Sequence, residues 1–525
     1  MKKVLLSMAV LLMGSAVNAQ NLGTRSWQKT IEAIEDDGMM IQAPVAVAPD
    51  GSVYATGTFN KSFIFAGTSL DPVATSAYVA KYSATGTEMW AQPLSGSATI
   101  TCAATDAEGN VYVAGKYADE VTLGSADGNS RVIQGMKDGA DYVTRQASMF
   151  LAKYDANGHL KAVRTIIPAI DATINGSGMY LDLGVMGFTP NHLQVAGGRV
   201  YVSALYSGDV RLDDMAWEGH YVNSPEIGMY MDNNAAGIFS VSAANLTGAK
   251  SEALLQTKEE VITNQLVPED VFFIVDGGTL YTAFAGQGEL TLVTPNNHTD
   301  FSFAHNEAGR EHAFILAAIG ASTTVKSFHG IADAAEAPVY TVDQMAVADG
   351  QLYVAGVSAA SNGFAPSQPS VGATNMYLAR LDASTLNLRS ALVDSYDEGD
   401  TKHSAEVLTG LNVVGGKTYV TGYVEKTDDH SVKSPLNWNV DTEFATADDA
   451  LVTSMSTNGK LLATLGNSKT LSTVTAYDAT TGIAALRAET VAKTGDNWYT
   501  VAGTKVARPT ASGLYIHKGK KYILR

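Results

Sequence analysis

An all-β fold is predicted by three features of the sequence. Short runs rich in Val, Ile, Tyr, Phe and Thr recur along the chain, each bounded by turn residues. The 49 glycines stand beside only 14 prolines, a balance typical of turn-rich β proteins. A third feature is a repeated segment in which a tyrosine follows a turn glycine by three residues. The six copies read PDGSVYATGTF, AEGNVYVAGKY, AGGRVYVSALY, DGGTLYTAFAG, ADGQLYVAGVS and VGGKTYVTGYV.

The repeat has the form of a four-stranded antiparallel unit. In the second copy four strand-like runs follow one another, namely TITCAATD, NVYVAGKY, SMFLAKYD and LKAVRTII. Successive repeat tyrosines are 58, 89, 80, 72 and 66 residues apart, so the strands keep their register while the connections vary in length. A period of this size, built from four strands, is typical of a β-propeller blade. The repeat tyrosines are Tyr54, Tyr112, Tyr201, Tyr281, Tyr353 and Tyr419.

The repeats predict a propeller of six blades, or of seven if the insertion at 166–190 forms another blade. In the sixth repeat, ALVTSMSTNG (450–459) and KLLATLG (460–466) are interpreted as the third and fourth strands. The early segment TRSWQKTIEA (24–33) resembles a closing strand such as EMWAQPL. We therefore expect one blade to combine strands from both ends of the chain, which protects sheet edges.

Three domains are predicted from the two ends and the charge distribution. Residues 1–19 have the positive start, short apolar run and small residues of a secretory signal, so the mature chain would begin at Gln20. Residues 20–467 hold 24 basic and 50 acidic residues, a net charge of −26, and form the predicted propeller. Residues 468–525 hold nine basic and three acidic residues, a net charge of +6, and form a predicted linker and small β segment of about four strands.

Composition excludes several functions. The formal net charge of −18 argues against nucleic-acid binding, which needs a basic surface. After the leader, no run of about 20 apolar residues is present to span a membrane. The single cysteine, Cys102, allows no internal disulfide and is interpreted as a buried structural thiol.

No catalytic, cofactor-binding or metal-binding residue is assigned from the sequence. His298, His305 and His312 recur every seven residues, a spacing that fits no common metal site. DAEGN (106–110) and DANGH (155–159) are interpreted as hairpin turns, not as calcium loops. The repeat tyrosines are interpreted as core residues, because a binding site would differ from blade to blade. Acidic pairs at 36–37, 213–214, 259–260, 428–429 and 448–449 are interpreted as solvated loop charge.

The C-terminal pattern WYTVAGTKVARP…GLYIHKGKKYILR resembles the C-terminal segments of many exported Bacteroidetes proteins. It is similar, in a short form, to the sorting domains associated with type IX secretion. VYVAGKY and FLAKYDANG also resemble bacterial extracellular β-propeller repeats. The resemblance implies an exported location and contact with export machinery through this segment, but no single activity.

These features predict an exported β-propeller at the outer cell surface or outside the cell, with the periplasm as the alternative. It would act as a non-enzymatic binding module for a protein or glycan ligand, without a cofactor. The predicted contact surface consists of loops between second and third strands, at 61–76, 123–147 and 359–374. Two alternatives are a carbohydrate-active hydrolase or lyase with carboxylates at the mouth of the channel, and a purely structural surface protein.

Overall fold

The structure is a computed structural model whose regular elements are strands. It describes residues 24–32, 40–135, 148–169, 180–182, 187–224, 229–233, 235–258, 270–303, 305–306, 309–332, 341–358, 363–365, 375–394, 404–414, 417–426, 433–435, 444–445, 454–458, 461–467, 471–478, 498–500, 505–506, 513–517 and 520–524.

Seven sheets, here called blades 1 to 7, are built mainly from consecutive antiparallel strands. Each is given below from its inner strand outward. Blade 1 contains β2 (Met40–Val47), β3 (Val53–Phe59), β6 (Ser76–Tyr82) and the first half of β7 (Glu88–Thr105). Blade 2 contains the second half of β7, β8 (Val111–Leu123), β10 (Ser148–Tyr154) and β11 (Leu160–Ile166). Blade 3 contains β13 (Phe188–Ala196), β14 (Arg199–Tyr206), β19 (Ala235–Ser242) and β20 (Lys250–Thr257).

The remaining blades follow in chain order. Blade 4 contains β21 (Asp270–Asp276), β22 (Thr279–Gln287), β26 (Gly309–Ile319) and β27 (Thr323–Ala332). Blade 5 contains β28 (Gln344–Ala348), β29 (Gln351–Ser358), β30 (Asn375–Asp382) and β31 (Leu388–Asp394). Blade 6 contains β32 (Ser404–Val414), β33 (Lys417–Lys426) and the short β34 (Lys433–Pro435) and β35 (Phe444–Ala445). Blade 7 contains β36 (Ser454–Thr457), β37 (Leu461–Asn467), β38 (Leu471–Asp478) and β1 (Thr24–Glu32).

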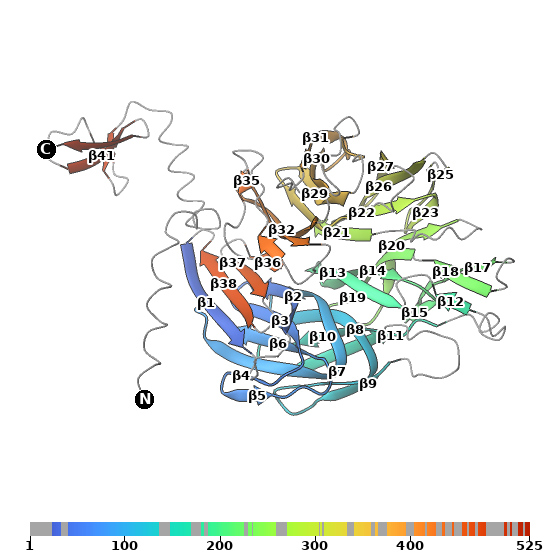
Figure 1. Ribbon diagram of the computed structural model, residues 1–525, viewed down its shortest axis with the longest axis horizontal. Helices are drawn as coiled ribbons and strands as arrows, with labels where there is room; N and C mark the ends of the chain where they lie inside the picture. Colours follow the sequence, from blue (N-terminus) through green and yellow to red (C-terminus); the bar gives the residue numbers. More distant parts are fainter. Residues whose placement is uncertain are drawn as a thin grey trace.

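The inner strands contact one another in a closed ring. β2, β7, β13, β21, β28, β32 and β36 are neighbours in that order, and β36 returns to β2. Figure 1 shows the first and last strands of this ring side by side. Four-stranded sheets arranged around a common axis make a β-propeller, so the predicted fold class is confirmed.

Blade 7 closes the ring with strands from both ends of the chain. β1 pairs antiparallel with β38 along its length, as the closing-strand interpretation of 24–33 predicted. The seventh blade does not come from the insertion at 166–190, and the assignment of 450–459 and 460–466 to the sixth repeat was wrong. These segments supply β36 and β37, because β38 adds a third strand beside them and leaves β36 facing the axis. Blade 7 therefore includes residues up to Asp478, beyond the predicted division at 467.

One strand belongs to two blades. β7 pairs with β6 through Leu94 and with β8 from Leu94 onward, with a register shift between Ser95 and Ser97. Gly96 lies at this shift with a φ of +131°, and a Cβ there would lie 2.5 Å from the carbonyl oxygen of Glu120. A residue without a side chain is therefore needed where the chain passes from one blade to the next.

Several connections between second and third strands fold into hairpins against the outer strand of the preceding blade. β4 (Phe63–Phe65) and β5 (Thr68–Leu70) contact β7, and β4 also contacts β1. β15 (Val210–Leu212) and β16 (Met215–Trp217) form a hairpin in which β15 contacts β11. β23 (Glu289–Thr294) pairs with β20, and β24 (Asn297–Ser302) pairs with β23, so blade 3 becomes six-stranded. β9 (Arg131–Gln134) pairs with the extension of β8. Covering edge strands in this way limits unwanted pairing with other chains.

These hairpins change the interpretation of the predicted contact loops. In the 61–76 connection, Phe63, Phe65 and Leu70 are buried in the core. In the 359–374 connection, Phe364 is buried and stacks on Phe314, with ring centroids 4.7 Å apart. The described parts of these two connections therefore contribute to packing. In the remaining predicted contact loop, 123–147, residues 136–147 lie outside the described residues.

Besides the two-stranded hairpins β4–β5 and β15–β16, the described residues form two further small sheets outside the blades. The insertion at 166–190 contributes β12 (Tyr180–Asp182), which pairs with β18 (Met229–Asn233), and β18 pairs with β17 (His220–Ser224). β25 (His305–Asn306) pairs with β26. The predicted four strands of the C-terminal segment are confirmed as a sheet of β39 (Trp498–Thr500), β40 (Lys505–Val506), β41 (Gly513–His517) and β42 (Lys520–Leu524).

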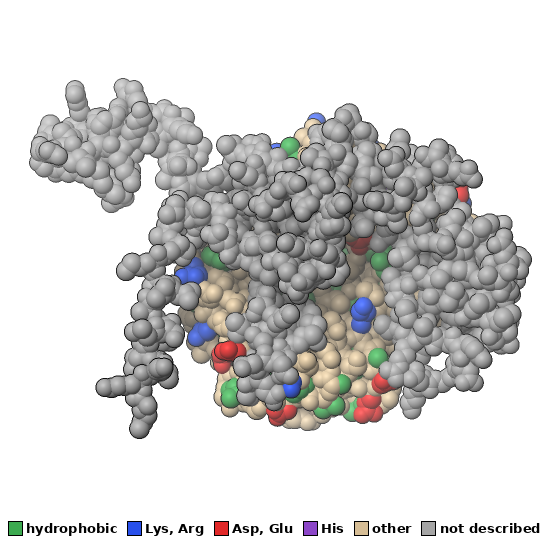
Figure 2. Space-filling model, in the orientation of Figure 1, with side chains coloured by type: hydrophobic (Ala, Val, Ile, Leu, Met, Phe, Trp, Pro, Cys, Tyr) green, Lys and Arg blue, Asp and Glu red, His purple; other side chains and the backbone are tan. Residues whose placement is uncertain are grey.

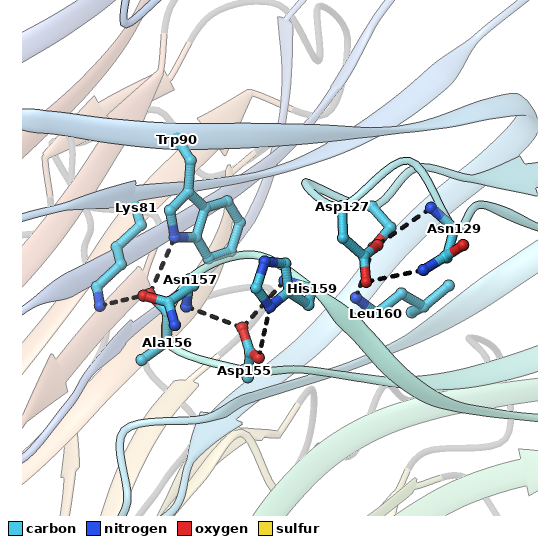
Figure 3. Close-up of polar contacts among 10 residues, drawn as sticks. Lys81, Trp90, Asp127, Asn129, Asp155, Ala156, Asn157, His159 and Leu160 are labelled. Atoms are coloured by element: carbon cyan, nitrogen blue, oxygen red, sulfur yellow. Dashed lines mark hydrogen bonds and ion pairs between the residues drawn. The ribbon is translucent and has the colours of Figure 1, made fainter.

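The core lies between blades, and the repeated motifs join one blade to the next. Tyr54 on the second strand of blade 1 is fully buried, and its hydroxyl donates to the carbonyl oxygen of Gly109 in blade 2 (2.6 Å). Lys81 on the third strand lies over the Tyr54 ring and donates to the carbonyl oxygen of Ala156 (2.9 Å), as Figure 3 shows for the second contact. The buried ammonium thus gains a cation–π contact and a hydrogen bond together.

Other blades repeat this arrangement. In blade 2, the Tyr112 hydroxyl and the Lys153 ammonium both donate to the carbonyl oxygen of Ala243 in blade 3, at 2.7 and 2.8 Å. In blade 5, the Arg380 guanidinium lies over the ring of Tyr353, which is buried. The core interpretation of the repeat tyrosines is therefore confirmed for these three blades.

The turn glycine after the third strand accommodates a tryptophan from the preceding blade. Trp90 packs against Gly158 and donates from its indole nitrogen to the carbonyl oxygen of Ala156 (3.1 Å; Figure 3). Trp27 of β1 packs in the same way against Gly86 of blade 1. A Cβ at Gly158 would lie 2.8 Å from the indole ring, so this contact requires glycine for space as well as for its φ of +84°.

Replacing Gly158 tests this requirement for space. Gly109 has a similar φ of +80° but no atom within 4 Å of its Cβ position, so it is the matched control. Gly109→Ala should cost about 1–2 kcal/mol from the left-handed backbone alone. Gly158→Ala should cost a further ~1–3 kcal/mol from overpacking against Trp90. Denaturant unfolding would measure both, and equal losses would contradict the packing argument.

Truncation tests the extent of blade 7. A chain ending at Asn467 lacks β38, so β1 loses its partner and the fully buried Val474 and Ala476 are removed. We expect this chain to unfold several degrees lower in calorimetry than the full chain, with a broader transition. A chain ending at Asp478 should retain the transition of the propeller. Equal Tm values for the two truncated chains would show that β38 does not close the ring.

Candidate functional site

The inner strands of the seven blades surround a cavity of about 660 Å³, here called the axial channel. Its lining comes from β2, β7, β13, β21, β28, β32 and β36, together with Val342 and Asp343, which lie just before β28. Among the described lining residues are many Thr, Ser, Asn and Gln side chains, but no Lys or Arg. Its volume lies within the range of about 300–1,000 Å³ typical of small-molecule sites.

Bulges place polar side chains along the channel wall. Thr101 is the extra residue in β7, opposite the step from Ala114 to Gly115. Asn191 and Thr409 are the extra residues at the corresponding positions of β13 and β32. A bulge redirects a side chain and increases local twist. Here it lets the side chains of Thr101 and Asn191 reach the backbone of the next blade.

Neighbouring inner strands are joined by hydrogen bonds between a side chain and a backbone group. These bonds are found between blades 1 and 2, 2 and 3, 3 and 4, 4 and 5, 5 and 6, and 7 and 1. They run from Thr105 Oγ1 to Val47 O (2.9 Å), Thr101 Oγ1 to Pro190 O (2.6 Å), Asn191 Nδ2 to Val271 O (2.7 Å), Val342 N to Asp270 Oδ2 (2.9 Å), Leu408 N to Asp343 Oδ2 (3.1 Å) and Val45 N to Ser454 Oγ (3.0 Å).

Two carboxyl groups lie in the channel wall on successive blades. Asp270 accepts hydrogen bonds from the backbone of Val342 and from Asn191, and Asp343 accepts one from the backbone of Leu408. Burial, followed by repulsion from Asp343, raises the pKa of Asp270 to about 7. Burial raises the pKa of Asp343 to about 6. Both values exceed the ordinary value near 4, so desolvation outweighs the hydrogen bonds that favour the charged forms.

An aromatic pair lies beside the carboxyl groups. The His192 ring stacks on Phe272, with centroids 3.9 Å apart, and both residues line the channel. Burial lowers the pKa of His192 to about 3, so its imidazole is neutral near pH 7. A neutral imidazole offers one hydrogen-bond donor and one acceptor.

The single cysteine also lies in the channel wall. Cys102 is buried, and burial raises the pKa of its thiol to about 12. A thiol held in this form is a poor nucleophile. The predicted burial of Cys102 is therefore confirmed.

A second cavity of about 610 Å³ lies among the hairpin turns of blades 1 to 3 and shares Val47, Thr105 and Val195 with the axial channel. Asp106 lies in its wall and accepts hydrogen bonds from the backbone of Glu108 and Asn110 within its own turn. Asp155 accepts the equivalent bonds from Asn157 and His159. Both segments are therefore hairpin turns, as predicted.

The sequence singled out other titratable residues that the structure does not bring together. His298 lies on β24, His305 on β25 and His312 on β26, where His312 is buried. Asp213 forms an ion pair with Arg164 in blade 2, away from the axis. The other acidic pairs lie outside the described residues. Within the described part of the chain, no group of three or more His, Cys, Asp or Glu could hold a metal ion.

Asp270 and Asp343 were not identified from the sequence. Each stands at the beginning of the first strand of its repeat, in PEDVFF and TVDQMAV. The equivalent inner-strand segments of blades 2 and 3 bring Thr101 and Asn191 to the axis instead. An acidic residue at the start of an otherwise apolar first strand was therefore the available signal.

Comparison with known proteins shows no family for this chain. No protein-family model matches the chain, and no curated protein matches it. Similar solved structures include BamB from Moraxella catarrhalis, at 11% identity and a TM-score of 0.36, which covers 85% of this chain and 100% of its own. A protein of unknown function from Dyadobacter fermentans has 9% identity and a TM-score of 0.36, covering 86% and 98%. The β-propeller domain of the trilobed protease from Pyrococcus furiosus has 7% identity and a TM-score of 0.37, covering 84% and 95%. Likenesses at this level carry no argument about function.

The bonds between blades can be tested at Thr101. Thr101→Val removes the donor to Pro190 O with little change of shape and should lower the free energy of unfolding by about 1 kcal/mol. Thr99 also lines the channel, but no hydrogen bond joins its side chain to another described residue, so Thr99→Val is the control. Denaturant unfolding would measure both variants. A control loss as large as that of Thr101→Val would show that the hydroxyl bond is not the cause.

Proposed function

We propose that this chain is an exported, surface-associated binding module whose ligand, a protein segment or a glycan, enters the axial channel. Residues 1–19 would direct export, and residues 468–525, which contain β39 to β42, would act as a sorting segment. The mature propeller would then act at the outer surface or beyond it, without catalysis. In the described part of the chain, no helix is long and apolar enough to cross a membrane.

The observation that carries this proposal is the channel itself. It is a cavity of about 660 Å³ enclosed by strands from every blade, and it is lined by hydroxyl and amide groups. Thr99, His192 and Gln344 also line it, and no hydrogen bond joins their side chains to the backbone of the described residues, which favours contact with a ligand. In the described part of the face shown in Figure 2, acidic and basic side chains are scattered and form no single charged patch. This distribution favours binding in the recessed channel and not on a charged surface.

The two channel carboxyl groups favour an alternative function. A carbohydrate-active hydrolase or lyase would use Asp270 and Asp343 as acid and base. Two features support binding instead. Both pKa values are raised in the same direction, whereas an acid and base pair normally has its pKa values shifted apart. Both carboxyl groups also accept backbone N–H bonds from the next blade, which ties them to the wall.

A binding screen of the mature chain, residues 20–525, would test the proposal. The full chain is needed because a fragment ending at Asn467 lacks β38. Purified protein would be screened against glycan and host-protein arrays, with hydrolysis products measured in the same samples. We expect saturable binding without turnover.

Two variants locate the binding site. Thr99→Trp fills the channel and should weaken binding at least about tenfold, which corresponds to roughly 1.4 kcal/mol. Thr68→Trp, on the exposed hairpin of β4 and β5, should leave binding unchanged. Binding that survives Thr99→Trp would place the site on the loops. Turnover that is lost in Asp343→Asn would establish the enzymatic alternative, and a chain that binds nothing would favour a purely structural role.

A further inference from the structure

Two kinds of acceptor can be compared among the bonds between blades in which a backbone N–H donates to a side chain. Between blades 7 and 1, the backbone N–H groups of Val45 and Val47 donate to the hydroxyls of Ser454 and Ser456, at 3.0 and 3.1 Å. Between blades 4 and 5 and between blades 5 and 6, the backbone N–H groups of Val342 and Leu408 donate to carboxyl groups instead. In both classes a backbone N–H donates across a junction between blades, but only the second class of acceptor can gain or lose a proton near neutral pH.

We propose that the junctions from blade 4 to blade 6, held by Asp270 and Asp343, form a pH-sensitive seam that is tight in mild acid and loosens as the pH rises through neutrality. The seam consists of β21, β28 and β32, which are consecutive in the ring. Opening at either junction would widen the axial channel, because all three strands line it.

The charged surroundings of the two groups leave their ionisation uncompensated. Among the described residues, the charged group that acts on Asp270 is Asp343, and it repels the Asp270 carboxylate. On β13, His192 is neutral above pH 4 because burial lowers its pKa to about 3. On β7, Cys102 is neutral because burial raises its pKa to about 12. The described lining from β2, β28, β32 and β36 adds no cation.

The direction of the pH effect follows from linkage. Each carboxyl group has a raised pKa in the folded chain, so the folded state binds more protons than the unfolded state between about pH 4 and pH 7. The stability that these groups contribute is complete below pH 4 and is lost as the pH rises through 6 and 7. An ionised carboxylate accepts a hydrogen bond from N–H more strongly than a protonated carboxyl group does. The raised pKa values indicate that the cost of burial and repulsion is larger than this gain in hydrogen-bond energy.

Other carboxyl groups act in a different pH range. Hydrogen bonds lower the pKa of Asp127 and of Asp300 to about 2. Their contribution to stability is present above pH 4 and is lost only as the pH falls below that value. The range from pH 5 to pH 8 therefore excludes their response. The lowered pKa of His192 opposes the seam below about pH 6.5, where the unfolded state binds an extra proton at this residue, and it does so in the wild type and in the variants below alike.

Thermal unfolding of the full chain between pH 5 and pH 8 tests the seam. We expect the wild-type Tm to fall between pH 5 and about pH 7 and to change little above that value. Asp343→Asn keeps an oxygen to accept the Leu408 N–H and removes the charge that repels Asp270, so its Tm should change much less. Exposed Glu108→Gln removes the same charge elsewhere and should retain the wild-type slope. Equal slopes for all three proteins would overturn the proposal.

Hydrogen exchange provides a local readout if Asp343→Asn fails to fold. In the wild type, exchange rates corrected for intrinsic pH dependence should rise between pH 5.5 and pH 8 at the amides of Val342 and Leu408. The amides of Val45 and Val47, which donate to serine hydroxyls, are the internal control and should change little. An equal response at the two pairs of amides would also overturn the proposal.

Discussion

Closure of the ring between blade 7 and blade 1 is the constraint on which the rest of the structure depends. Val45 N and Ser454 Oγ meet across 409 residues of sequence, and β1 pairs with β38 at the outer edge of the same blade. A four-stranded blade cannot bury both of its faces alone, so each blade relies on two neighbours. An open ring would leave one face of blade 1 and one face of blade 7 in water.

The blades use two different means to reach their neighbours. Blades 1 and 2 rely on a tyrosine and a lysine that donate to turns of the next blade, as Tyr54 and Lys81 do. In blade 3, Ser240 occupies the strand position opposite Tyr201, so no lysine extends there. The junction to blade 4 is held nearer the axis by Gln194, which exchanges two hydrogen bonds with the backbone of Val275. At the junction between blades 3 and 4, where Tyr201 has no lysine partner, hydrogen bonds nearer the axis join the blades.

The same residues explain how far the sequence could predict the structure. Strand composition and the repeat tyrosines were sufficient to predict the blades, because burial of Tyr54 or Tyr112 depends on a pattern that each repeat carries by itself. The assignment of 450–466 was wrong because an apolar run does not reveal whether its strand is inner or outer. That position depends on pairing between β1 and β38, which lie at opposite ends of the chain. The channel carboxyl groups were missed for a related reason, since 73 residues separate Asp270 and Asp343 in the sequence and only the ring brings them together.

The hairpins between second and third strands also explain why the axis is the better candidate site. Covering an outer edge uses apolar residues such as Phe63 and Phe65, which are then buried and unavailable to a ligand. The channel wall has the opposite character, with polar groups held at fixed positions by bonds between blades. A ligand in the channel would contact several blades at once and would bind only the closed ring. By mass action it would stabilise that ring, so occupancy of the channel and tightness of the seam would be thermodynamically coupled.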